Sequence, residues 1–375
     1  MKILAPRSRL CQLLSSRAPS SEDLKDGQLW GAAMREGMDQ LLWSAMQQQR
    51  EIAADHEFRE ASEANQYHQA AQFLRRRHAC GQVLSALRRT GIPVLCMRGL
   101  AVSEPLYGEN APLRPQSDID LLLSEARMLD AKQALWDIGF RPHQSYRNIY
   151  FRGDIMLDLH HEPLGMERIR AWQYLTPLRA SDFFKYAEEG ELAGEKALLV
   201  SPRVHLPYLC FHALKHSFER LIWLYDIALL ANSIDAAGQW DEVLAGIREY
   251  RLQRPCYYAL AYVGEYLGAS VPERLLNDIR PDMGFIERRL FARHMNHEVI
   301  PYLAERLFAR MQPDFSHRLA FWCETIYPRY EVRQQMAQGG CVKCNFIRKR
   351  LKQLLKAGWQ FLREGASLLL VRRPH

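Results

Sequence analysis

Two aspartates one residue apart, Asp118 and Asp120, lead directly into an aliphatic run at residues 121–123. This pattern is typical of the end of a buried strand, where side chains two residues apart leave the same face. Two neighbouring carboxylates repel each other unless a cation lies between them. Oxygen ligands of this kind suit Mg²⁺ or Mn²⁺ carrying a phosphate-rich substrate. The pair therefore predicts the start of a phosphoryl- or nucleotidyl-transfer site.

A two-metal site needs a further oxygen ligand, because the two ions lie roughly 3.5–4 Å apart and share their ligands. Asp158 is the candidate. Residues 149–151 and 155–160 flank a tight turn at Gly153, which predicts a hairpin. In its second strand Asp158 and His160 share one face, and that face also carries the aspartate pair if the two strands are neighbours. An Asp-x-Asp pair alone is common by chance. A following hairpin that carries an inward aspartate favours a metal site over this chance occurrence.

The elements that position these residues follow from periodicity, caps and breakers. We expect residues 1–25 to be loosely packed, helices from about 29 to 90, a strand opening at 93–97, a helix over 99–107 and another over 124–138. Beyond residue 200 almost all the chain is predicted to be helical. The fold class is α+β, with a small mixed sheet flanked by N-terminal helices and a larger C-terminal helical domain. The predicted domains are residues 1–90, 91–200 and 201–375.

Residues 203–232 predict one long helix with a polar stripe. The stripe contains His205, His212, Lys215, His216, Glu219, Trp223 and Asp226. A polar stripe on a buried helix must be paired or face a cleft, and we expect it to face the site, with Lys215 touching the β- and γ-phosphates. Three alternatives stay open. Lys215 and Glu219 could pair along the helix; Asp226 could form a salt bridge with Arg114; and His212 and His216, with Glu219, have the spacing of a zinc pair.

Composition limits the class of protein. The chain has 375 residues, 48% of them hydrophobic, and a net charge of +7, which favours anionic partners. Several cysteines lie in apolar stretches, as reduced thiols do in cytoplasmic proteins, and Cys341 and Cys344 predict a loop, with metal or redox chemistry as the alternative. We expect a cytoplasmic protein without a signal peptide or a membrane span, since the first residues contain charges and a proline and no apolar run reaches the ~20 residues that a span needs. A basic amphipathic segment at 346–370 could touch a membrane surface or pack on the core.

Several motifs together resemble a known family. They are Val94-Leu-Cys-Met-Arg98-Gly99, Pro105-Leu-Tyr107-Gly108, Leu113-Arg114-Pro115, Ser117-Asp118-Ile-Asp120, Asp158-Leu-His160 and His212-Ala-Leu-Lys215-His216. On these the chain resembles the bacterial uncharacterised nucleotidyltransferases, within the polymerase-beta-like nucleotidyltransferase superfamily. The resemblance implies a sheet of the polymerase-beta-like type. It also implies a metal-dependent transfer of a nucleoside monophosphate from an NTP such as ATP to an acceptor, with release of pyrophosphate.

The resemblance also implies roles for single residues. Asp118 and Asp120 match the metal-binding pair, and Asp158 matches the third carboxylate, which assists deprotonation of the acceptor. Arg98 and Gly99 stand where the superfamily has Lys and the glycine of a Gly-Ser pair; here Leu100 follows, and the nearest hydroxyl is Ser103. We expect Arg98, Gly99, Arg114 and Lys215 to contact the triphosphate. The alternative is a non-catalytic module of the same fold that binds a protein or RNA partner. Nucleic acid is not favoured, since no aromatic and basic platform is evident.

Overall fold

The strands in the described part of the chain form one mixed sheet of seven strands. The computed structural model describes residues 6–15, 23, 26–47, 56–144, 146, 148–165, 169–330 and 332–333. The strand order is β3-β4-β5-β2-β1-β7-β6, with β2–β5 and β1–β7 parallel and the other pairs antiparallel. The strands are β1 (Val94–Cys96), β2 (Asp118–Leu123), β3 (Arg141–Pro142), β4 (Ile149–Arg152), β5 (Ile155–His160), β6 (Glu188–Leu192) and β7 (Glu195–Leu199).

The α+β class and the mixed sheet agree with the prediction, but the sheet is larger than the small one expected. The unexpected hairpin of β6 and β7 lengthens it at one edge. The sequence of β6, with glutamates at 188, 189 and 191, has no apolar alternation, and most of this strand is exposed. Charged residues are a common way to protect an edge strand, and they hide it from a search for apolar periodicity.

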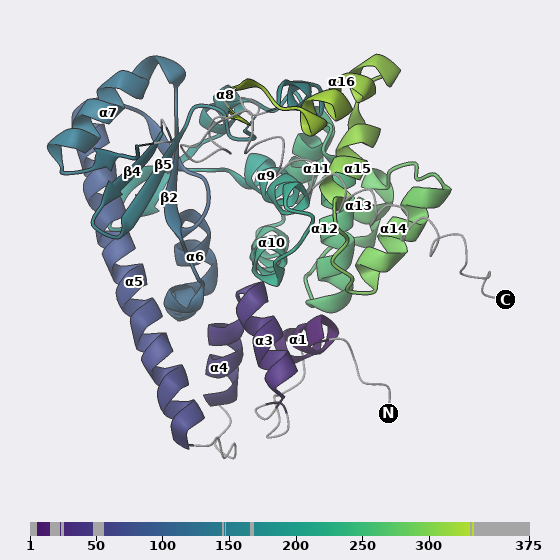
Figure 1. Ribbon diagram of the computed structural model, residues 1–375, viewed down its shortest axis with the longest axis horizontal. Coiled ribbons are helices and arrows are strands. Elements are labelled where there is room, and N and C mark those ends of the chain that lie inside the picture. The colour runs from purple at the N-terminus through teal and green to yellow at the C-terminus, as the bar shows by residue number, and fades with distance from the viewer. Residues whose placement is uncertain are drawn as a thin grey trace.

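Helices precede and follow the sheet in the chain (Figure 1). Those before it are α1 (Pro6–Ser15), α3 (Gly27–Glu36), α4 (Asp39–Gln47) and the long α5 (His56–Arg89). Those between strands are α6 (Leu100–Tyr107), α7 (Met128–Asp137) and α8 (Ala180–Lys185), with 3₁₀ turns at Gly108–Leu113, Glu125–Arg127 and Arg170–Tyr174. Those after it are α9 (Pro202–Lys215), α10 (Leu221–Ala236), α11 (Trp240–Glu249), α12 (Gln253–Tyr266), α13 (Glu273–Ile279), α14 (Phe285–Met295), α15 (Leu303–Met311) and α16 (Phe315–Ile326).

Local signals place several of these elements as expected. The left-handed Gly91 follows the end of α5, and Gly153 forms the turn between β4 and β5 with φ of 60°. These conformations cost glycine little, because it has no Cβ. Leu121 and Leu122 leave opposite faces of β2 and both are fully buried, so both faces of the sheet are covered. Helix α5 packs against β2, β5 and β7.

Three expectations need correction. Asp118 and Asp120 lie at the beginning of β2 rather than the end of a strand, because the residues that pair with β1 are the leucines that follow them. The N-terminal residues are not all loosely packed: α1 buries Leu10, Cys11 and Leu13.

The third correction is that the long helix over 203–232 is two helices. Helix α9 ends at Lys215 and α10 begins at Leu221. Ser217 and Phe218, between them, have left-handed backbone conformations. Phe218 is buried against Tyr258 and the ring of His294, and this packing is absent from local sequence patterns.

The N-terminal helices are tied to the start of α10. The Leu221 amide donates to Glu36 Oε2 over 2.6 Å, and Arg7 donates to the Phe218 carbonyl over 2.8 Å. The boundaries predicted at residues 90 and 200 enclose all seven strands, but these contacts join the helices before the sheet to those after it. Whether the three segments are separate domains stays a prediction.

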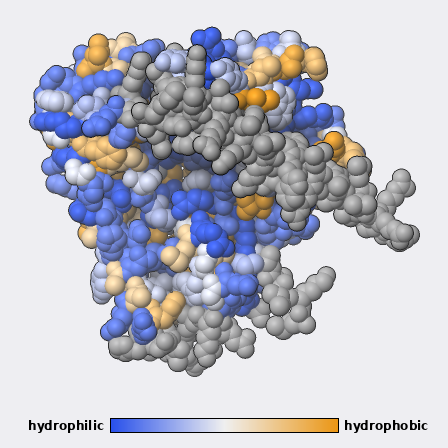
Figure 2. Space-filling view, in the orientation of Figure 1, coloured by the Kyte–Doolittle hydropathy of each residue, from blue (hydrophilic) through white to orange (hydrophobic). Residues whose placement is uncertain are grey.

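The expectations on membrane spans and on the C-terminal segment can be compared with the described residues. On the face shown in Figure 2, hydrophobic residues form small separate patches among hydrophilic ones. None of the helices in the described part of the chain combines the length and apolar character needed to cross a membrane. The pair Cys341 and Cys344 and the basic segment 346–370 lie outside the described residues.

The contact between α9 and α11 gives a stability prediction. A Cβ at Gly246 would lie 2.1 Å from the Arg203 carbonyl oxygen, so α11 can approach α9 this closely only with glycine. We expect Gly246→Ala to lower the free energy of unfolding by about 1–3 kcal/mol, the usual cost of overpacking. Urea unfolding followed by circular dichroism measures it. The matched control is Gly31→Ala inside α3, whose new Cβ would meet only the flexible end of Arg35; equal losses in the two variants would contradict the packing argument.

Candidate functional site

The parallel pairing of β2 and β5 places Asp120 directly opposite Asp158. His160 lies on the same face, with Nε2 3.0 Å from Asp120 Oδ1 and 3.4 Å from Asp158 Oδ2. One ligand atom from each of these three residues lies within 4.8 Å of the others, and among the described residues no other group of three has such an arrangement. The expectation that the two strands are neighbours and share a polar face is therefore confirmed.

Asp118 stands next to this group without belonging to it. Its Oδ1 accepts a hydrogen bond from Ser117 Oγ over 2.8 Å, and it lines the adjoining cavity. Burial raises the pKa of the Asp118 carboxyl, and the charge of Asp120 raises it further. The charge of Asp120 thus disfavours the charged form of Asp118, as the sequence argument expects of two neighbouring carboxylates.

Arg98 is the positive charge that compensates Asp120. Its Nη2 donates to Asp120 Oδ1 over 2.6 Å, and its Nη1 contacts His212 Nε2. Burial alone would raise the pKa of Asp120, but Arg98 and the hydrogen bond from His160 hold it well below its usual range. Burial and the neighbouring Arg98 hold the pKa of His212 well below its ordinary value, so the neutral ring accepts from the guanidinium. Arg98 thereby links β2 to α9.

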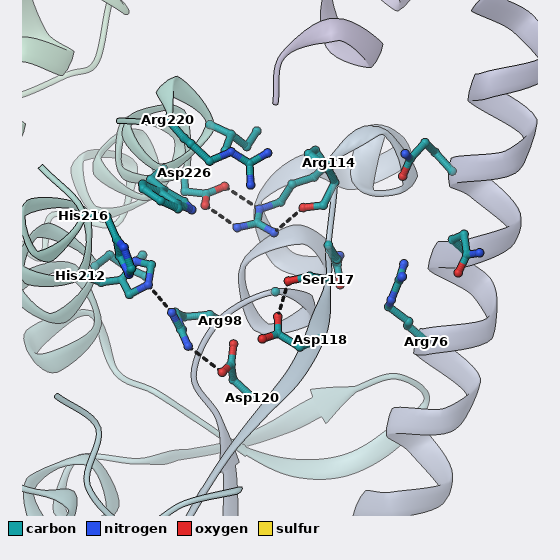
Figure 3. Close-up of a pocket in the computed structure, with 18 of the residues that line it drawn as sticks. Arg76, Arg98, Arg114, Ser117, Asp118, Asp120, His212, His216, Arg220 and Asp226 are labelled. Atoms are coloured by element: carbon teal, nitrogen blue, oxygen red, sulfur yellow. Dashed lines mark hydrogen bonds and ion pairs between the residues drawn. The ribbon is translucent and has the colours of Figure 1, made fainter. Parts of the chain in front are cut away.

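A cavity of about 540 Å³ opens beside these groups. Figure 3 shows Asp118 and Asp120 on one side of it, Arg76 on α5 on another, and the α9 and α10 residues opposite. From the predicted polar stripe, His212, His216, Trp223 and Asp226 line this cavity. Gly99, with φ of 60°, also lines it at the start of α6.

Arg114 is held by Asp226. Its Nε and Nη2 donate to the two carboxylate oxygens over 2.8 and 2.6 Å, and Tyr107 donates to Oδ1 over 2.6 Å. Both partners are buried. The alternative of a salt bridge between Asp226 and Arg114 is confirmed, and it braces the loop before Asp118 against α10. Arg114 also lines the cavity, so its contact with a phosphate stays a prediction.

Lys215 lies away from the cavity lining. Its Nζ is 3.5 Å from the Leu164 carbonyl and 5.1 Å from the centre of the Trp172 ring. Because α9 ends at Lys215, the side chain turns toward this neighbouring loop, and the predicted contact with the β- and γ-phosphates is not supported. Ser103 is fully buried and accepts a hydrogen bond from Gln116, so it is not presented to a ligand.

The zinc alternative finds no support in the described residues. The rings of His212 and His216 lie with their centres 4.9 Å apart and their planes tilted by 58°, but no third ligand joins them in the part of the chain that the structure describes. Glu219 lies in the turn after α9 rather than on its face, so the i, i+4 pairing with Lys215 is lost as well.

Sequence reasoning missed residues contributed by two elements. His68, Gln69, Gln72 and Arg76 reach the cavity from α5, and Arg220 reaches it from the turn before α10. A 34-residue helix carries polar residues on several faces, so the sequence alone does not say which face meets the site. It also missed the ligand potential of His160, although it placed His160 on the correct face.

Buried His205 predicts a pH dependence of stability. Its Nε2 lies 3.1 Å from the Met97 carbonyl, and burial lowers its pKa to about 4. The unfolded chain, with a histidine pKa of about 6.5, therefore binds the proton first, and stability is lost as the pH falls from 6.5 toward 4. We expect His205→Gln to remove about 2 kcal/mol of the stability difference between pH 7 and pH 5. Urea unfolding at both pH values tests this; equal differences in native and variant protein would refute it.

The Arg114–Asp226 pair predicts strong coupling. We expect Arg114→Met or Asp226→Leu alone to cost about 3–5 kcal/mol, because each leaves a buried charge without its partner. The double variant should be more stable than either single variant, since it removes both charges. Chemical denaturation of the four proteins measures the coupling. Additive losses would show that the pair is not energetically coupled.

Comparisons with known proteins identify the family of the chain. No curated protein matches the chain. Among solved structures, that of the antibiotic-resistance factor ANT(2'')-Ia is similar, with 19% sequence identity and a TM-score of 0.31, over 49% of this chain and 94% of that one. Residues 22–268 match the model of a family described as uncharacterised nucleotidyltransferase. This match spans α3, the sheet, the cavity and α10, and the chain belongs to this nucleotidyltransferase family.

Proposed function

We propose that the chain transfers a nucleoside monophosphate from an NTP to an acceptor hydroxyl or similar group and releases pyrophosphate. One observation carries the proposal: Asp120 and Asp158 face each other across the parallel strands β2 and β5, with Asp118 two residues away at the cavity. Membership of the nucleotidyltransferase family supports the reaction class. ATP is the first donor to assay.

The donor set fits a divalent cation. Asp118, Asp120 and Asp158 supply the carboxylate oxygens that Mg²⁺ and Mn²⁺ prefer, and His160 adds a nitrogen within the same group. The chemistry that such a cation supplies is neutralisation of charge on phosphate oxygens and orientation of the reacting groups.

The remaining roles belong to side chains of this protein. Asp158, half-buried on β5, is placed to accept the proton of the acceptor as it attacks the α-phosphorus. Arg98 and Gly99, at the edge of the cavity, are placed to neutralise and approach a phosphate. The volume of about 540 Å³ lies in the range of small-molecule sites, so an NTP and part of an acceptor fit.

The second candidate is a non-catalytic module that kept the fold. The observation that favours it is the Arg98–Asp120 ion pair, in which a guanidinium holds one oxygen of a predicted metal ligand. In a catalytic protein the cation would bind the other oxygen of Asp120 or displace the guanidinium, whereas in a scaffold Arg98 and His160 alone would compensate this carboxylate. Metal-dependent binding of nucleotide separates the two functions.

Calorimetry of ATP and the other NTPs with Mg²⁺ tests the proposal. We expect the native chain to bind at least one NTP in a metal-dependent manner, and Asp118→Asn, Asp120→Asn and Asp158→Asn to lose at least tenfold in affinity or all detectable turnover, since a neutral amide is a poorer ligand for a hard cation. Asp154→Asn is the matched control, because Asp154 is exposed at the β4–β5 turn and its loss should change neither quantity.

Turnover is measured by pyrophosphate release in the presence of cell extract, with mass spectrometry of proteins and small molecules for a gain of one nucleotide. Absence of metal-dependent binding and of turnover for every NTP would reject the enzyme and favour the scaffold. Binding that is equal in the native chain and in all three carboxylate variants would reject the assigned metal site.

A further inference from the structure

Four arginines line the cavity, and they fall into two pairs. Arg98 and Arg114 are engaged by Asp120 and Asp226 in ion pairs of 2.6 Å. Arg76 and Arg220, in contrast, have no hydrogen bond or ion pair with any residue of the part of the chain that the structure describes, and Figure 3 draws none between them and the other residues shown. The buried Nε of Arg76 lacks a hydrogen-bond partner.

Both open guanidiniums are partly withdrawn from water. Burial lowers the pKa of Arg76 despite the opposing charges of Asp154 and Asp118. Burial also lowers the pKa of Arg220, and the nearby Arg114 adds to this. The Arg220 guanidinium lies over the Trp223 ring at 5.8 Å from its centre, but neither arginine gains a carboxylate of the described residues within ion-pair distance that would offset its lost hydration. The free energy lost is recovered if an anion enters the cavity.

The two side chains come from one segment that precedes the sheet in sequence and one that follows it. Arg76 projects from α5, and Arg220 precedes α10. The Arg220 side chain passes so close to Gly37 that a Cβ there would lie 2.5 Å from Nη2. The next amide, Leu221 N–H, is held by Glu36 Oε2. The N-terminal helices therefore fix the turn that carries Arg220 and leave room for its guanidinium.

We propose that Arg76 and Arg220 bind the β- and γ-phosphates of the NTP, between α5 and the start of α10. Planar guanidiniums suit phosphate because they donate two parallel hydrogen bonds. The assignment gives the N-terminal helices a part in substrate binding and replaces the contact expected from Lys215. It rests on the proposed function for the identity of the ligand as an NTP, but the anion site itself can be tested without metal or turnover.

The probe is inorganic tripolyphosphate, titrated calorimetrically in EDTA against the full chain. We expect measurable binding by the native protein and at least tenfold weaker binding by Arg76→Gln and by Arg220→Gln, which corresponds to about 1.4 kcal/mol or more. Arg76→Lys and Arg220→Lys should retain part of the affinity, because charge remains while the paired hydrogen bonds are lost. Arg75→Gln is the matched control: it removes the same charge from the neighbouring position on α5, where Arg75 pairs with Asp154 outside the cavity lining.

The outcomes separate this inference from the proposed function. Asp118→Asn should bind tripolyphosphate at least as tightly as the native chain. If both proteins bind tripolyphosphate but the native chain turns over no NTP, the anion site is supported and the proposed reaction is rejected. If turnover depends on the carboxylates but both Gln variants bind tripolyphosphate as the native chain does, the inference is overturned. Native protein that does not bind the probe, or an equal loss in Arg75→Gln, also overturns it. Thermal unfolding of Arg220→Gln and Arg220→Lys separates loss of binding from loss of fold.

Discussion

The buried carboxylate of Asp120 must be compensated, and this constraint organises the site. A charge at the start of a covered strand would be strongly unfavourable without opposite charge and hydrogen bonds. Arg98 and His160 provide both, over 2.6 and 3.0 Å. Arg98 Nη1 also donates to the neutral ring of His212 on α9. The arginine that compensates the charge of Asp120 therefore also positions α9 against the sheet. The same requirement makes the place attractive to a divalent cation.

The cavity exists because three parts of the chain are held around it. The Arg114–Asp226 pair joins the loop before β2 to α10, and the hydrogen bond from Leu221 to Glu36 joins α10 to α3. The family match from residue 22 to 268 includes both links. Helices α3, α4 and α5 therefore lie within the family match, and α5 supplies one wall of the cavity.

The four arginines of the cavity differ in whether a carboxylate of the protein pairs with them. Arg98 and Arg114 form ion pairs that hold the strand and the loop in place, although both also line the cavity. Arg76 and Arg220 form no such pair among the described residues, so their guanidiniums are open to a ligand. The cavity lining carries four arginines and three aspartates, so arginine charge is in excess there, which suits a polyphosphate more than a neutral ligand.

Much of the local structure could be predicted from the sequence, because the signals are set by neighbours along the chain. Alternation placed Asp158 and His160 on one face of β5, Gly153 marked the hairpin, and Gly91 marked the end of α5. The charged edge strand β6 and the break after Lys215 were missed, since one lacks apolar alternation and the other depends on where Phe218 is buried. Only the tertiary structure decided that Arg98 pairs with Asp120, 22 residues away, and that Arg76 faces the cavity. A sequence determines which side chains share a face of one element; which faces meet depends on contacts between distant segments, and those are settled when the whole chain packs.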